Sequence, residues 1–178
     1  MAVLVEGISV LIRVSAIRER YPGSWPAFVK NAPNNTLCSD NELGRVGFLS
    51  PDDCKSFVGV LETLGIVYLK DGRSQDSVIV DQMQGMAAPC DWADFGRIEL
   101  QPGRVVSAAK LRVTKQREVF CPDGWTYKGL LSDQYGFVPT GREDKSFRFL
   151  RHENGLDVFL NLLTGKEIFI GRIDARSK

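Results

Sequence analysis

The spacing of apolar residues changes partway along this chain of 178 residues, and the change limits the folds it can adopt. Beyond an N-terminal strand, apolar residues up to residue 65 recur largely at helical spacing, whereas after residue 77 they mostly alternate. Helices grouped before a run of strands indicate an α+β fold whose helices cover one face of a mainly antiparallel sheet. We therefore predict one compact domain over 1–178, with helices within 1–70 and antiparallel strands over 77–178.

The best-defined element is a helix in the segment GRVGFLSPDDCKSFVGVLETLG. Ser50 suits the N-cap and Pro51 the first helical position, and two aspartates follow where the helix dipole favours negative charge. Gly65 stands where a left-handed residue ends a helix. The apolar stripe follows the i, i+3, i+4, i+7 rule and consists of Cys54, Phe57, Val58, Leu61 and Leu64.

Shorter elements are predicted on both sides of this helix, giving two or three short helices in the N-terminal third. A helix capped by Ser15 ends near Tyr21, and another begins at Ser24. Strands are predicted at 4–14, 46–49 and 66–69. The first of these presents Leu4, Ile8, Val10, Ile12 and Val14 on one face.

The residues after 77 predict antiparallel strands joined by tight turns. Pro102-Gly103 fits the centre of a type II turn and predicts a hairpin between FGRIELQ and RVVSAAKLRV. Asn154-Gly155 and Thr164-Gly165 divide the last residues into a C-terminal three-stranded meander. Its strands are predicted at 146–152, 156–162 and 166–173, and SVIVDQM and REVF are predicted as further strands.

Composition excludes several classes of protein. Lys and Arg total 23 against 22 Asp and Glu, and a net charge of +1 gives no general attraction to nucleic acid or to anionic membranes. No apolar run approaches the roughly 20 residues that span a bilayer. The start MAVLVEGISVLIRV lacks the basic segment and cleavage pattern of a signal peptide. We predict a cytoplasmic protein with no membrane contact.

Motifs for metal, nucleotide or cysteine chemistry are missing. Cysteines occur at positions 38, 54, 90 and 121 without a Cys-x-x-Cys pair, and His152 is the only histidine, so the usual zinc patterns are excluded. There is no glycine-rich phosphate loop. His152 is also the only imidazole base for a cysteine nucleophile, and it flanks a predicted tight turn. We predict no metal, no cofactor and no catalytic residue, and we favour a protein that is not an enzyme.

Two loops, PCDWADFG and CPDGWTYKG, share a small set of residue types and are the main candidates for a ligand site. Each combines large amphipathic rings with charged residues that could hold a polar ligand. The alternative is that both loops only form turns, because Asp, Pro and Gly are turn residues. The candidate ligand residues are Asp91, Trp92, Asp94, Phe95, Arg97, Asp123, Trp125 and Tyr127.

Basic residues in the second half form a weaker candidate for a nucleic-acid surface. Alternating Lys110 and Arg112 could follow phosphates along a strand. Basic residues on the outer face of a sheet also keep it in solution, and the near-neutral charge argues against nucleic acid as a partner. The candidate residues are Lys110, Arg112, Lys115, Arg117, Arg148 and Arg151.

Three functions are compatible with this pattern. The leading hypothesis is a non-enzymatic protein of the inhibitor or immunity type that recognises another protein through a sheet face or through the aromatic loops. The second is a small-molecule-binding or hydrolytic protein, with a pocket near Trp92 and Trp125. The third is a nucleic-acid-binding sheet. An exposed edge of the C-terminal meander could also pair across a two-fold axis to form a homodimer.

Overall fold

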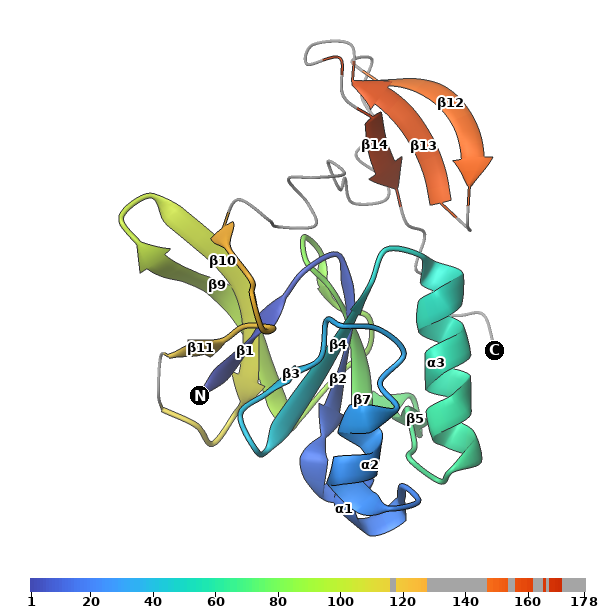
Figure 1. Cartoon of the computed structure of the whole chain (residues 1–178), viewed down its shortest axis with the longest axis vertical. Coiled ribbons are helices and arrows are strands. Elements are labelled where there is room, and N and C mark those ends of the chain that lie inside the picture. Colours follow the sequence, from blue (N-terminus) through green and yellow to red (C-terminus); the bar gives the residue numbers. More distant parts are fainter. Residues whose placement is uncertain (116–117, 128–146, 154–155, 162–164, 166, 171–178) are drawn as a thin grey trace.

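A five-stranded antiparallel sheet forms the middle layer of the molecule, with helices on one face and a second sheet on the other (Figure 1). This computed structural model describes residues 1–115, 118–127, 147–153, 156–161, 165 and 167–170. The middle sheet has the order β3-β4-β2-β7-β8. Its strands are β2 (Ile8–Arg13), β3 (Cys38–Ser39), β4 (Leu43–Phe48), β7 (Ser77–Asp81) and β8 (Gly85–Met86). With mainly antiparallel strands and three helices in the described residues, the predicted α+β class is confirmed.

Three helices, α1 (Val14–Arg20), α2 (Ser24–Lys30) and α3 (Pro51–Thr63), pack on one face of this sheet. Together they form a helix-side core, which contains Ile8, Val10, Ile12, Ile17, Phe28, Val46, Phe48, Cys54, Val58, Leu61, Ile66 and Ile79. The predicted caps of α3 are confirmed, because the Asp53 amide donates to Ser50 Oγ at 3.4 Å and Gly65 has a φ of 78°. The cap of α1 was predicted wrongly, since that helix begins at Val14 and its N-cap is Arg13.

A four-stranded sheet of order β11-β1-β10-β9 packs on the other face. Its strands are β1 (Ala2–Val5), β9 (Ala93–Gln101), β10 (Arg104–Leu111) and β11 (Val119–Phe120). The Pro-Gly hairpin is confirmed by β9 and β10, and Gly103 has a φ of 75°, as a type II turn requires. The apolar residues between the two sheets form an inter-sheet core, which contains Val3, Val5, Leu11, Cys38, Leu43, Val78, Val80, Cys90, Ala93 and Ala109.

The prediction of one continuous N-terminal strand is wrong. The chain breaks at Glu6-Gly7 into β1 and β2, which belong to different sheets. Gly7 has a φ of 55°, and a Cβ at this position would lie 2.8 Å from the Phe48 carbonyl oxygen. A glycine is therefore needed where the chain crosses from one sheet to the other. Leu4, predicted to share a face with Ile8, consequently lies outside the helix-side core.

The segment Ile66 to Leu69 was predicted as a strand, but it enters only a two-stranded hairpin at its end. That hairpin consists of β5 (Leu69–Lys70) and β6 (Arg73–Ser74). Before it, the Val67 amide donates to Asp76 Oδ2 at 2.9 Å, and the Asp76 amide donates back to the Val67 carbonyl at 2.9 Å. These two bonds to Asp76 satisfy Val67 without a neighbouring strand of the main sheets.

The C-terminal meander is confirmed as a three-stranded antiparallel sheet of order β12-β13-β14. Its strands are β12 (Phe147–Glu153), β13 (Leu156–Asn161) and β14 (Glu167–Ile170). The predicted turn at Asn154-Gly155 and residue Thr164 lie outside the described residues. Within the ranges that the structure describes, no helix is both long and apolar enough to cross a membrane.

Candidate ligand site

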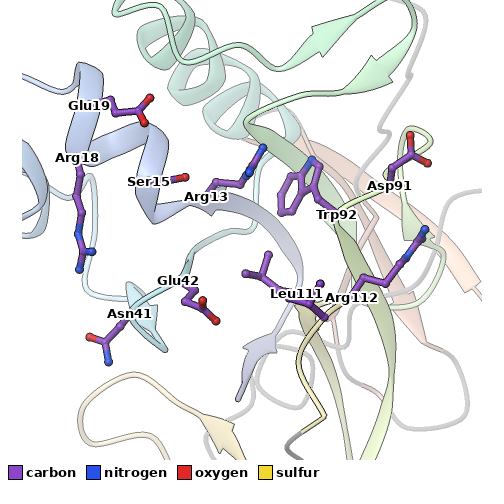
Figure 2. Close-up of a pocket in the computed structure, with 11 residues that line it drawn as sticks. Arg13, Ser15, Arg18, Glu19, Asn41, Glu42, Asp91, Trp92, Leu111 and Arg112 are labelled. Atoms are coloured by element: carbon purple, nitrogen blue, oxygen red, sulfur yellow. The ribbon is translucent and has the colours of Figure 1, made fainter.

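A pocket of about 690 Å³ opens at one end of the space between the two sheets, and we call it the Arg13–Trp92 pocket. Pockets of roughly 300–1,000 Å³ are typical of small-molecule sites. Figure 2 shows the side chains that line it, which come from the end of β2, from α1, from the turn between β3 and β4, and from the ends of β9 and β10. The lining residues are Arg13, Ser15, Arg18, Glu19, Asn41, Glu42, Asp91, Trp92, Leu111, Arg112 and Val113.

Arg13 reaches this pocket because of the alternation along β2. Alternate residues of β2, such as Ile12, face the helix-side core, so Leu11 and Arg13 face the second sheet. Arg13 is the last residue of the strand, opposite the buried Leu43 of β4. Its backbone is held by a hydrogen bond from its amide to the Asp76 carbonyl at 2.9 Å. Arg13 is half-buried, and its side chain lines the pocket at this end of the inter-sheet space.

Trp92 forms the aromatic wall of the pocket. Its ring packs against the inter-sheet core and is half-buried, and its Nε1 donates to the Ser74 carbonyl at 3.1 Å. This bond satisfies the only polar atom of the indole and fixes the orientation of the ring. In Figure 2 the Arg13 side chain extends toward Trp92, and Leu111 lies on the lower side of the same space.

Several charged groups around the pocket already have partners. Arg112 donates from Nε to Asp94 Oδ1 and from Nη2 to the Cys90 carbonyl, both at 3.1 Å. Asp91 accepts two hydrogen bonds from Arg73, at 2.8 Å and 2.5 Å, and these bonds lower the pKa of the Asp91 carboxyl group. These pairs are exposed, so they orient side chains and contribute little to stability.

Other charged groups of the lining are left without a partner. Among the described residues, the side chains of Arg13, Arg18 and Glu42 take part in no ion pair, whereas Glu19 lies 3.5 Å from Arg20. Arg13 is the most informative of the three because the residue is half-buried, whereas Arg18 and Glu42 are exposed. A buried charge without a counter-charge is unfavourable, so this position favours an anionic ligand.

The structure divides the candidate ligand residues of the first loop between two pockets. Asp91 and Trp92 line the Arg13–Trp92 pocket. Asp94, Phe95 and Arg97 line a second pocket, of about 530 Å³, over the hairpin of β9 and β10. The two pockets share none of these residues, because Asp91 and Trp92 precede β9, whereas Asp94, Phe95 and Arg97 lie within it.

The candidates from the second loop lie elsewhere. Trp125 Nε1 donates to Glu6 Oε1 at 3.0 Å, and the guanidinium carbon of Arg104 lies 5.3 Å from the centre of the Tyr127 ring. Asp123 is exposed in the turn that the Trp125 amide closes on the Pro122 carbonyl at 3.0 Å. The turn interpretation of this loop therefore has direct structural support.

The candidate nucleic-acid residues come from two separate sheets. Lys110 donates to the Thr114 carbonyl at 2.8 Å, and Lys115 is exposed nearby. Arg148 and Arg151 belong to β12 in the C-terminal sheet, and Arg151 pairs with two carboxylates, Glu153 at 2.8 Å and Glu167 at 2.9 Å. Arg117 lies outside the described residues.

Three of the four cysteines do not have the properties of activated nucleophiles. Burial raises the pKa of Cys54 to about 12 and that of Cys121 to about 11, and it raises the pKa of Cys38 against the opposing charge of Arg45. Thiols with raised pKa values stay protonated at neutral pH and react slowly. His152 lies in β12, where its Nδ1 contacts Asp157. No group of three His, Cys, Asp or Glu side chains that could hold a metal occurs in the part of the chain that the structure describes.

A buried arginine of β4 also lies on the inter-sheet face of the middle sheet. Arg45 is fully buried and donates to Ser9 Oγ at 2.9 Å, to the Thr36 carbonyl at 3.1 Å and to the Glu6 carbonyl at 3.1 Å. Burial lowers its pKa, although an arginine keeps its charge at neutral pH. A Cβ on Gly47 would lie 2.5 Å from Arg45 Nη2, so the arginine also requires the glycine beside it. We call this group the Arg45 cluster.

Sequence analysis missed both arginines of the inter-sheet space. Arg13 and Arg45 resemble ordinary exposed basic residues in the sequence, and only the placement of a second sheet over β2 and β4 gives them their roles. Part of the signal was present, because Arg13 alternates with the strand residues that face the helices. A charged residue on the strand face opposite the helices would have indicated that the space over this face is open to solvent at that end of the strand.

Comparison of the chain with protein-family models, with curated proteins and with solved structures finds no match.

Proposed function

We propose that the protein binds a small anionic organic molecule in the Arg13–Trp92 pocket. The observation that carries this proposal is the half-buried residue Arg13, which takes part in no ion pair within the described residues, beside the half-buried Trp92 in a pocket of ligand size. This is the second of the three hypotheses from the sequence, a small-molecule-binding protein, and of the two aromatic loops the pocket uses only the one that carries Trp92.

The lining indicates how such a ligand would be held. A carboxylate or phosphate can accept two parallel hydrogen bonds from the Arg13 guanidinium, and Arg18 adds positive charge at the rim. The flat or apolar part of the ligand would lie against Trp92 and Leu111. Asn41 and Glu42 supply further polar contacts, which would select among anions of similar size.

The chemistry of the lining favours binding over hydrolysis. A serine nucleophile needs a neighbouring base that is itself oriented by a third group. Ser15 is the only hydroxyl of the lining, and the described lining residues include no histidine, lysine, cysteine or tyrosine. Two of the lining carboxylates, Asp91 and Glu19, are already paired with arginines. Within the described residues, Ser15 makes no hydrogen bond to a lining carboxylate, so the pocket has groups for recognition without a bonded hydroxyl–base pair.

Native mass spectrometry of protein purified gently at low salt tests this proposal. We expect a bound small molecule that is retained by the wild-type chain and lost from Arg13→Gln and Trp92→Ala variants. Lys70→Gln is the matched control, because it removes one positive charge from an exposed residue of β5 that does not line the pocket. Retention of the same ligand by Arg13→Gln would contradict the proposal, as would a wild-type chain that retains no small molecule and binds none of a panel of small carboxylates and phosphate esters.

Recognition of another protein is the second candidate. The observation that favours it is the exposed end of the β9–β10 hairpin, where Leu100 is 37% and Val105 46% exposed. Apolar side chains on an exposed strand edge are typical of surfaces that pair with another chain.

A further inference from the structure

The outer edge of β9 is an unpaired strand edge in the part of the chain that the structure describes. Within these residues, β9 has a hydrogen-bonded neighbour on one side only, which is β10 (Figure 1). At its start the strand lies against β8, where Gly85 packs on the Phe95 ring, but from Gly96 to Gln101 most residues are exposed. Half of the backbone N–H and C=O groups of an edge strand point outward and can pair with another strand.

The charges on β9 are arranged so that they complement each other. Ala93 and Phe95 face the inter-sheet core, so alternation places Arg97 and Glu99 on that same face and Ile98 on the other. Arg97 and Glu99 are both exposed. Among the residues that the structure describes, Arg97 has no carboxylate partner, and Glu99 Oε1 accepts a hydrogen bond from the Gly103 amide at 2.8 Å.

We propose that β9 pairs with β9 of a second copy of this chain, antiparallel and with Ile98 on the two-fold axis. In this register, Arg97 of each copy lies opposite Glu99 of the other, which gives two equivalent ion pairs on one face. Ile98 lies opposite its own copy on the other face, so an apolar contact joins the ion pairs. The sheet β11-β1-β10-β9 then continues through the axis into the second molecule.

Neighbouring registers are disfavoured by the same residues. Shifting the axis to residue 97 places two arginines opposite each other, and shifting it to residue 99 places two glutamates opposite each other. Like charges directly opposite each other destabilise a strand pair. The charge pattern therefore selects the Ile98 register and favours a copy of this chain over an unrelated strand.

The pairing is short, which sets the expected strength. The ladder between β9 and β10 shifts register between Arg104 and Val105, so a bulge beside Leu100 ends the regular edge. A strand pair of this length buries less surface than a standard stable interface of about 1,200–2,000 Å². We expect a reversible dimer that dissociates on dilution, in contrast to an obligate one.

Sedimentation over micromolar to near-millimolar concentrations tests this dimer with two charge variants, Arg97→Glu and Glu99→Arg. Each variant places like charges opposite each other at both pairs. We therefore expect each variant alone to have a dimer dissociation constant at least about tenfold higher than that of the wild type. Mixed together, the two variants restore opposite charges at both positions and should form a heterodimer. The double variant R97E/E99R also restores both ion pairs and should dimerise like the wild type.

Lys70→Glu serves as the control, because it makes the same charge change as Arg97→Glu at an exposed position away from β9. Circular dichroism and thermal unfolding verify that each variant is folded. A wild-type chain that stays monomeric at every concentration would overturn the proposal. The proposal would also be overturned if both single variants dimerise as the wild type does, or if the two variants form no heterodimer when mixed. Binding of a different protein through Arg97 and Glu99, by a chain that stays monomeric, would overturn it as well.

Discussion

The two faces of the middle sheet differ in what they bury. The helix-side core is almost wholly apolar and includes contacts between aromatic rings, such as Phe28 and Phe57 with ring centres 6.4 Å apart. The inter-sheet face of the same strands carries Arg13 at the end of β2 and the buried Arg45 in β4, together with smaller residues such as Val78 and Val80. The middle sheet therefore has one apolar face, which stabilises the fold, and one face that carries arginine side chains.

This difference follows from what covers each face. Helices present continuous apolar stripes, so the strand residues that face them must also be apolar. The second sheet leaves its ends open, and backbone carbonyls at those ends can accept hydrogen bonds from a guanidinium group. Arg45 uses such carbonyls, those of Thr36 and Glu6, whereas Arg13 faces a pocket.

The largest expected effect comes from removing the buried charge of the Arg45 cluster. Arg45→Met leaves the Glu6 and Thr36 carbonyls without their guanidinium donors, and breaking a buried polar network of this kind costs about 3–5 kcal/mol. Urea unfolding followed by circular dichroism measures the loss. Arg13→Met is the control in the Arg13–Trp92 pocket and should change the free energy of unfolding far less. Equal effects of the two variants would mean that the two arginines contribute alike to stability.

A cavity on the helix side is expected to have the next largest effect. Leu61 of α3 is fully buried, and Leu61→Ala should lower the free energy of unfolding by about 2–5 kcal/mol through lost burial and the remaining cavity. Because the middle sheet separates Leu61 from Arg45, the double variant with Arg45→Met should show additive losses within about 0.5 kcal/mol. A larger coupling energy would mean that the two faces act as one core.

The smallest expected effect concerns Asp81, a charge that alternation places on the helix side with Ile79. Burial raises the pKa of its carboxyl group, against hydrogen bonds from the Gln84 and Met83 amides that lower it. The folded state therefore binds this proton more tightly than the unfolded state, and its contribution to stability is lost as pH rises through the raised pKa, from about pH 4 upward. Asp81→Asn should flatten that part of the stability profile, which unfolding at a series of pH values measures. An unchanged profile would show that this carboxyl group titrates alike in both states.

Local signals explain which parts of the fold could be predicted from sequence. The α3 helix carries its own start and stop in Ser50, Pro51 and Gly65, and the β9–β10 hairpin carries its turn in Pro102-Gly103. Such signals depend on a few neighbouring residues, so they survive without knowledge of the fold. The C-terminal meander could be predicted for the same reason.

Long-range packing explains what could not be predicted. The break at Gly7 depends on the Phe48 carbonyl, which is distant in sequence, and the role of Arg45 depends on Glu6 and Thr36. The Arg13–Trp92 pocket joins residues from five parts of the chain. Of the candidate ligand residues, sequence analysis could place Trp92 in a loop, but it could not indicate that Arg13 faces the same space.

The pairing of β1 has a consequence for the order in which the molecule folds during synthesis. Ala2 lies opposite Lys110 on one side and Val119 on the other, so β1 is completed by strands that are made more than a hundred residues later. At about 5–20 residues per second, the ribosome needs roughly 6–23 s to reach Val119 after Ala2. During that interval the apolar segment Ala2–Val5 has neither partner, which makes it a segment that chaperones would be expected to bind.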